Sequence, residues 1–141
     1  MLHGEQRFVW PVRVYYEDTD SAGVVYYANY LRYFERARTE WLRALGFEQT
    51  DIATQYGVVF VVRTAHVEYL QPARLNDALR ISVELSEVGA SQITVTQQVM
   101  RGQALLVDAQ MRLACVSIAS MKPVRIPTPL RKAVGIKIRT P

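Results

Sequence analysis

The longest helical pattern of the chain lies between Tyr30 and Leu45. Apolar side chains recur there every three or four residues, which places them on one face of a helix. They are Tyr30, Phe34, Ala37, Trp41 and Leu45. Gly46 follows the last of them and is typical of a helix end, because glycine readily adopts the left-handed conformation that terminates helices. The pattern therefore predicts one long amphipathic helix.

Most of the remaining chain alternates apolar and polar residues, as half-buried strands do. We expect strands at about residues 8–16, 58–69, 79–86, 93–99 and 105–118. Pro11 has no N–H to donate, so the first strand lies at an edge or is only beginning there. The segments Gly89-Ala90-Ser91 and Gly102-Gln103 are typical of turns. Strands joined by short turns pair antiparallel with their neighbours, which predicts an α+β fold with one helix on a five-stranded antiparallel sheet.

One helix covers only part of such a sheet. We therefore expect exposed apolar surface or an open strand edge, and with it self-association. The length of 141 residues, half of them apolar, suits a single domain over residues 1–141. After Met121, the three prolines Pro123, Pro127 and Pro129 predict that residues 122–141 form an extended tail.

Charge is unevenly distributed along the chain. Residues 1–108 hold 10 Lys and Arg against 13 Asp and Glu, whereas residues 109–141 hold 7 Lys and Arg and no acid. The basic end is either a solvated tail or a patch that meets a polyanion, such as a phosphorylated cofactor, nucleic acid or anionic lipid. Nucleic acid is the weaker of these, because residues 122–139 lack interleaved aromatic side chains.

Several kinds of site are disfavoured by composition. Cys115 is the only cysteine, so no internal disulfide forms, and we interpret it as a buried hydrophobe. The two histidines, His3 and His66, have no metal-ligand spacing, and we expect neither a metal nor a cofactor. Residues 1–10 lack an apolar leader segment, and no apolar run is long enough to span a membrane. Together these features favour a reducing, cytoplasmic setting.

A cluster of carboxylates is the best candidate for chemistry. Glu17, Asp18 and Asp20 follow the first strand and precede a turn at Gly23 and the predicted helix. Acids there can simply complement the helix dipole. Alternatively, unpaired N–H groups at the helix start can hold an oxyanion while a carboxylate acts beside them, a minimal site for acyl transfer. The residues alone leave both readings open.

A family resemblance covers residues 8–123. Residues 12–20, 23–26, 29–31 and 34–38 resemble the Tol–Pal-associated acyl-CoA thioesterases of the hot-dog superfamily, next to the 4-hydroxybenzoyl-CoA thioesterases. Residues 60–63, 67–69 and 72–77 match as well. The resemblance implies a hot-dog fold, in which a five-stranded antiparallel sheet wraps a long central helix. It also implies dimers that often pair into tetramers, with active sites between subunits.

The activity implied by the resemblance is hydrolysis of an acyl-CoA to a free acid and coenzyme A, so that coenzyme A is part of the substrate. The catalytic aspartate falls on Asp20, which acts as nucleophile or as general base on water. The backbone N–H of Tyr27 becomes the oxyanion donor, and Tyr16 lines the same pocket. Val62, Arg63 and Ser91 become substrate-binding candidates.

One departure from the family pattern concerns Tyr27, where Tol–Pal-associated members usually carry histidine. Tyrosine is harmless if only the backbone N–H serves, and it can shift preference toward bulkier or aromatic acyl groups. A different class of function also fits: a non-catalytic module that holds an acyl-CoA or an acyl-carrier protein and docks a membrane-associated partner. Hot-dog dehydratases are disfavoured, because they use a histidine and none lies near Asp20.

Overall fold

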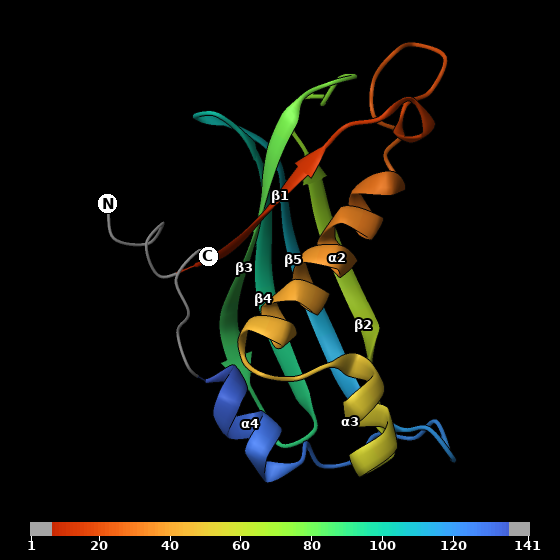
Figure 1. Cartoon of the computed structure of the whole chain (residues 1–141), viewed down its shortest axis with the longest axis vertical. Helices are drawn as coiled ribbons and strands as arrows, with labels where there is room; N and C mark the ends of the chain where they lie inside the picture. Colours follow the sequence, from red (N-terminus) through yellow and green to blue (C-terminus); the bar gives the residue numbers. More distant parts are fainter. Residues whose placement is uncertain (1–6, 136–141) are drawn as a thin grey trace.

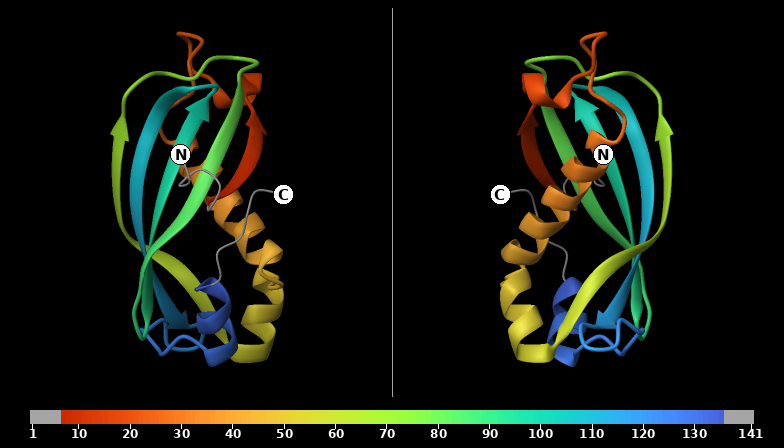
Figure 2. Two further views of the ribbon diagram at one scale, coloured as in Figure 1. Left: turned by 90° about the vertical axis from the view of Figure 1, so that its left-hand side faces the viewer. Right: turned by 90° about the vertical axis from the view of Figure 1, so that its right-hand side faces the viewer.

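The computed structural model describes residues 7–135. Five strands form one antiparallel sheet in the order β1-β3-β4-β5-β2. They are β1 (Phe8–Arg13), β2 (Val58–Tyr69), β3 (Ala78–Val88), β4 (Gln92–Arg101) and β5 (Ala104–Ser117). The long helix α2 (Asn29–Ala44) lies across one face of the sheet (Figure 1), and the side views show the sheet curving around it (Figure 2). The predicted α+β arrangement is confirmed.

Helix α2 matches the predicted amphipathic helix closely. Its buried side chains are Tyr30, Tyr33, Phe34, Ala37, Trp41 and Leu42. They pack against fully buried strand residues such as Phe8 and Ile81. Burying each large apolar side chain contributes about 1.5–3 kcal/mol, so this face holds the helix to the sheet. The helix ends before Gly46, whose φ of 97° is the left-handed conformation expected there.

The strand order departs from the chain order. β3, β4 and β5 pair with their sequence neighbours, but β2 pairs with β5 rather than with β3. The two sheet edges are therefore β1 and β2. Pro11 lies in β1, as expected for a residue that cannot donate a ladder hydrogen bond. The outer edge of β2 has no strand partner among residues 7–135.

Two short helices were not predicted, and one of them corrects the expected extended tail. Helix α3 (Gln49–Tyr56) buries only Ile52, so its sequence shows no clear apolar periodicity. Helix α4 (Thr128–Val134) buries Leu130 and Val134, so the tail is not extended there. Its proline lies in the first turn, where no intrahelical N–H is needed and proline is tolerated. The basic residues Lys137 and Arg139 lie outside the described residues.

Cys115 and His66 do not form a catalytic pair. Cys115 is fully buried opposite Phe60, whereas His66 is exposed opposite Gln110. Within residues 7–135 no group of three or more His, Cys, Asp or Glu side chains is placed to hold a metal ion. None of the described helices is both long and apolar enough to cross a bilayer.

Candidate active site

Asp20 lies on a narrow loop between the 3-10 turn η1 (Tyr16–Asp18) and α2. The Asp20 N–H donates to the Val24 carbonyl (2.9 Å), and the Gly23 N–H donates to the Asp20 carbonyl (3.0 Å). Gly23 has a φ of 81°, a conformation that glycine adopts without strain. The carboxylate is exposed: its Oδ1 accepts from the Ala22 N–H (2.8 Å), and Oδ2 has no donor among the described residues. One carboxylate oxygen is thus available to react.

Residues 72–77 hold this loop from behind. The Val25 N–H donates to the Ala73 carbonyl (2.8 Å), and Val24 bridges to Arg74. The Asp77 carboxylate accepts from the Arg74 N–H and from the Arg101 guanidinium, both at 2.8 Å. Burial acts to raise the pKa of Asp77, but these two donors outweigh it and hold the pKa below its usual value. An ion pair therefore fixes the segment on which the Asp20 loop rests.

Asp18 has a different environment from Asp20. It is buried, and its Oδ2 accepts from the Tyr15 N–H (2.9 Å). Its carbonyl accepts from the Tyr26 N–H (2.9 Å) and from Asn29 Nδ2 (2.8 Å), which ties η1 to the start of α2. Burial first, and then the Asp18 carboxylate, raise the pKa of Tyr33. The Tyr33 hydroxyl itself has no hydrogen-bond partner of good geometry in the described chain.

Two backbone donors are unused where α2 begins. The first turn is closed by the Asn29 N–H on Tyr26 (2.8 Å) and the Tyr30 N–H on Tyr27 (3.3 Å). Across residues 7–135, no acceptor pairs with the N–H groups of Tyr27 and Ala28. Such groups at a helix N-terminus carry partial positive charge and favour a negative oxygen. The Asp20 loop therefore leads to two free N–H donors that can stabilise a developing negative charge.

An aromatic hollow adjoins these donors. Tyr27, Tyr30 and Tyr69 line it, and its volume is about 240 Å³. The ring centroids of Tyr27 and Tyr69 lie 6.1 Å apart, edge to face, and those of Tyr30 and Tyr69 lie 5.7 Å apart. The Tyr30 hydroxyl accepts from the Ala73 N–H (3.0 Å), so the hollow is built on the segment that holds the Asp20 loop.

The other predicted site residues are not gathered here within one chain. Tyr16 is 80% exposed and lines a hollow with Arg13 and Asn76, whereas Tyr27 lines the hollow with Tyr30 and Tyr69. Arg63 sits at a bulge in β2, where the register shifts between Val62 and Thr64.

Ser91 lies in the turn between β3 and β4, which is at the opposite end of the sheet from the loop that precedes α2 and holds Asp20 (Figure 1). The 11 residues of β3 separate the two ends, which corresponds to about 35 Å. Asp20 and Ser91 are therefore far apart within one chain.

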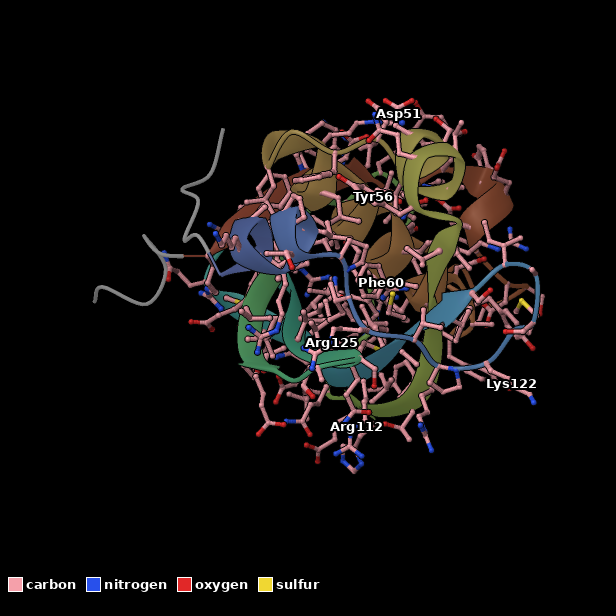
Figure 3. All side chains as sticks on the ribbon, turned by 90° about the horizontal axis from the view of Figure 1, so that it is seen from below. Asp51, Tyr56, Phe60, Arg112, Lys122 and Arg125 are labelled. Atoms are coloured by element: carbon pink, nitrogen blue, oxygen red, sulfur yellow. The ribbon has the colours of Figure 1, made fainter. Side chains whose placement is uncertain are left out.

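A pocket that the sequence did not predict lies between α2, α3 and the sheet. Its volume is about 160 Å³. Apolar side chains dominate its lining, which also includes Glu35, Arg38 and Gln49; the apolar members are Trp41, Leu42, Ile52, Val58, Val59, Phe60, Val62, Ile93 and Leu113. Seen from below, Phe60 lies near the middle of the molecule, with Tyr56 and Asp51 of α3 beyond it (Figure 3). The apolar run at residues 58–62 signalled a buried strand but not a cavity.

Comparison with known proteins assigns the family. Residues 14–134 match the model of the thioesterase-like superfamily. The chain belongs to this superfamily. It is 46% identical over 126 residues to the acyl-CoA thioesterase YbgC of Haemophilus influenzae, covering 89% of this chain and 93% of that protein. It is also 46% identical to the acyl-CoA thioester hydrolase YbgC of Escherichia coli, covering 85% of this chain and 90% of that one.

A solved structure agrees with the fold. The "probable thioesterase" of Bartonella henselae superposes with a TM-score of 0.82 at 35% identity, over 86% of this chain and 99% of that one. The resemblance to YbgC-type proteins, the hot-dog fold and the thioesterase class are thereby confirmed as predicted. The roles of Asp20, Tyr27, Tyr16, Val62, Arg63 and Ser91 stay predictions.

Proposed function

We propose that the protein hydrolyses acyl-CoA thioesters, with Asp20 as the catalytic carboxylate. The observation that carries this proposal is the exposed Asp20 carboxylate. It lies on a loop that is held by backbone hydrogen bonds and that leads to unpaired N–H groups at the start of α2. The names of the two relatives at 46% identity support acyl-CoA as the substrate class.

The chemistry divides between a donor and a carboxylate. The thioester carbonyl oxygen accepts from the Tyr27 N–H, which stabilises the negative charge that develops there. As a nucleophile, Asp20 attacks the carbonyl carbon, the C–S bond breaks, the coenzyme A thiolate leaves, and water hydrolyses the anhydride that results. As a general base, Asp20 takes a proton from water as that water attacks, and the proton passes to the leaving thiolate. Both routes yield a free acid and free coenzyme A.

A second copy of the chain completes the site in this proposal. β2 is 12 residues long and open along its outer edge, where Val59 is 37% and Val62 48% exposed. A long apolar edge invites strand pairing. Two-fold symmetry, the commonest in homodimers, makes two β2 strands antiparallel. The Val58 end of one strand then lies beside the Tyr69 end of the other, where Tyr69 contacts Tyr27, and Val62 lies near the middle of the strand.

The same pairing brings each Asp20 loop toward the opposite pole of the partner. Arg63 and Ser91 are then our candidates for contacts with coenzyme A, and Val62 for the route of the acyl group. Arg112 within β5, and Lys122 and Arg125 after it, add positive charge to the molecule as seen from that end (Figure 3). Coenzyme A belongs to the substrate, so the proposal needs no cofactor. A homotetramer, a cytoplasmic location, a Tol–Pal connection and an acyl-carrier protein as substrate donor stay predictions from the family resemblance.

The test measures free-thiol release from short, long and aromatic acyl-CoAs by the full chain. Binding of a non-hydrolysable acyl-CoA thioether is measured in parallel by calorimetry. We expect saturable release of one thiol for each acyl-CoA consumed. Tight binding without thiol release from any acyl-CoA contradicts the proposal and supports the non-catalytic binding module instead.

A further inference from the structure

The pocket between α2, α3 and the sheet contains a polar side chain, Arg38, that a buried residue holds in place. Gln97 is fully buried, and its amide nitrogen donates to the carbonyls of Phe34 (3.1 Å) and Ser82 (3.3 Å). Both amide hydrogens are used in this way, so the side-chain oxygen points elsewhere and accepts from the Arg38 guanidinium at 2.9 Å. A core residue thus holds Arg38 in one position at the pocket.

Arg38 lacks an acidic partner in this position. No carboxylate of the described residues lies within ion-pair distance of its guanidinium. Desolvation lowers the pKa of Arg38, and the nearby charge of Glu35 partly offsets the effect. A guanidinium has five N–H donors, and only one bond to Gln97 is formed. The remaining donors can serve other oxygen acceptors.

The size of the pocket limits what enters it. An engineered apolar cavity of about 150 Å³ takes up benzene, and this pocket has about 160 Å³. It therefore accommodates a group of roughly six to eight heavy atoms. Val59 and Val62 line it and are also exposed along the open edge of β2, so its mouth faces the side on which a second chain pairs.

We propose that this pocket receives the acyl group of a thioester bound at the partner's catalytic loop, and that Arg38 and Glu35 recognise an oxygen at the far end of that group. The inference rests on the proposed function and on the antiparallel pairing of β2. It names the substrate class as short acyl chains with a terminal hydroxyl group. The hydroxyl oxygen accepts from Arg38, and its proton is donated to Glu35, which also lines the pocket. A terminal carboxylate is less suitable, because Glu35 repels it.

The experiment compares two substrates that differ by one oxygen, hexanoyl-CoA and 6-hydroxyhexanoyl-CoA. We expect the native protein to favour the hydroxylated chain by at least about tenfold in kcat/KM, the lower end of what one hydrogen bond to a charged group contributes. Arg38→Met should abolish that preference, so that the two substrates react with equal kcat/KM. Arg32→Met is the matched control, since Arg32 is exposed on the same helix and outside the pocket, and it should keep the preference.

Two further substrates sharpen the test. Adipoyl-CoA, which ends in a carboxylate, should be poor for the native protein and improve in Glu35→Gln. Palmitoyl-CoA should react more slowly than hexanoyl-CoA, because its chain exceeds the pocket. Thermal unfolding and sedimentation of each variant are measured alongside.

Three results overturn the inference. The first is that Arg38→Met slows both six-carbon substrates equally. The second is that Arg38→Met dissociates the oligomer, which makes Arg38 an interface residue. The third is that the native protein turns over both substrates with the same kcat/KM. All three leave acyl-CoA hydrolysis standing. Failure of the proposed function looks different, because then the native protein releases no thiol from any of these substrates.

Discussion

Asp18 and Asp20 are two residues apart, and they lie in opposite environments. Asp18 is buried and accepts from the Tyr15 N–H, while its carbonyl secures Tyr26 and Asn29. Asp20 is exposed, and one of its carboxylate oxygens has no donor in the described chain. The Asp18 backbone carbonyl joins η1 to α2, and the Asp18 carboxylate closes the turn on Tyr15. The Asp20 carboxylate lies on the loop beside them.

The difference teaches that one acidic cluster can contain residues in two kinds of environment, so that the structural and the chemical interpretation need not concern the same residue. Acids near a helix start can stabilise local structure or take part in chemistry. Here Asp18 meets the structural description, and Asp20 is the candidate for chemistry. Substitution of Asp20 should therefore mainly change turnover, and substitution of Asp18 should mainly change stability.

The largest expected effect belongs to Asp20→Asn. Asparagine keeps the shape and the turn bond to Ala22 but can be neither nucleophile nor base. We expect turnover of acyl-CoA to fall by about a thousandfold, with the melting temperature within about two degrees of native. Thiol release and thermal unfolding check this. Native-like turnover in this variant removes Asp20 from the mechanism.

Asp18→Ala should show the reverse pattern. Removing a buried carboxylate that accepts a backbone hydrogen bond leaves the Tyr15 N–H unpaired, which costs about 1–3 kcal/mol of unfolding free energy. Turnover per folded molecule should fall far less than in Asp20→Asn. Urea unfolding and active-site-normalised rates measure both quantities. If Asp18→Ala lost more turnover than Asp20→Asn, Asp18 and not Asp20 would be the candidate catalytic carboxylate.

A smaller effect is expected from Arg101→Met, which removes the ion pair behind the Asp20 loop. The pair is partly exposed, so its loss should cost less than about 1 kcal/mol. Because the pKa of Asp77 is lowered in the folded state, this contribution is complete above the unfolded value of 3.8 and disappears as pH falls through the folded pKa. Urea unfolding of both proteins should therefore differ at pH 6 and converge in acid. A pH-independent difference contradicts this account.

The smallest effect at neutral pH is expected from Tyr33→Phe, on the Asp18 side. The hydroxyl has no hydrogen-bond partner in the described chain, so its removal should change stability little. The pKa of Tyr33 is raised in the folded state, so its contribution is complete below the unfolded value of 10.0 and is lost as pH rises above it. The variant should then lose less stability than native protein between about pH 10 and 11. Parallel losses contradict a buried, pKa-shifted Tyr33.

Local pattern determined much of this protein. The apolar stripe from Tyr30 to Trp41 defined α2, because side chains at helical spacing need one buried face. Alternation defined the strands for the same reason. The residues around Asp20 identified the family, since a long motif does not depend on packing to be recognised.

Tertiary structure alone decided what distant residues share. It put β2 beside β5 and left its apolar edge open, since strand order depends on contacts far apart in sequence. It gave Asp18 and Asp20 different environments, although one residue separates them. It also joined Arg38 of α2 to Gln97 of β4 at an unpredicted pocket. A single side chain's burial and partners are set by the elements packed around it, and these are not encoded in its neighbours along the chain.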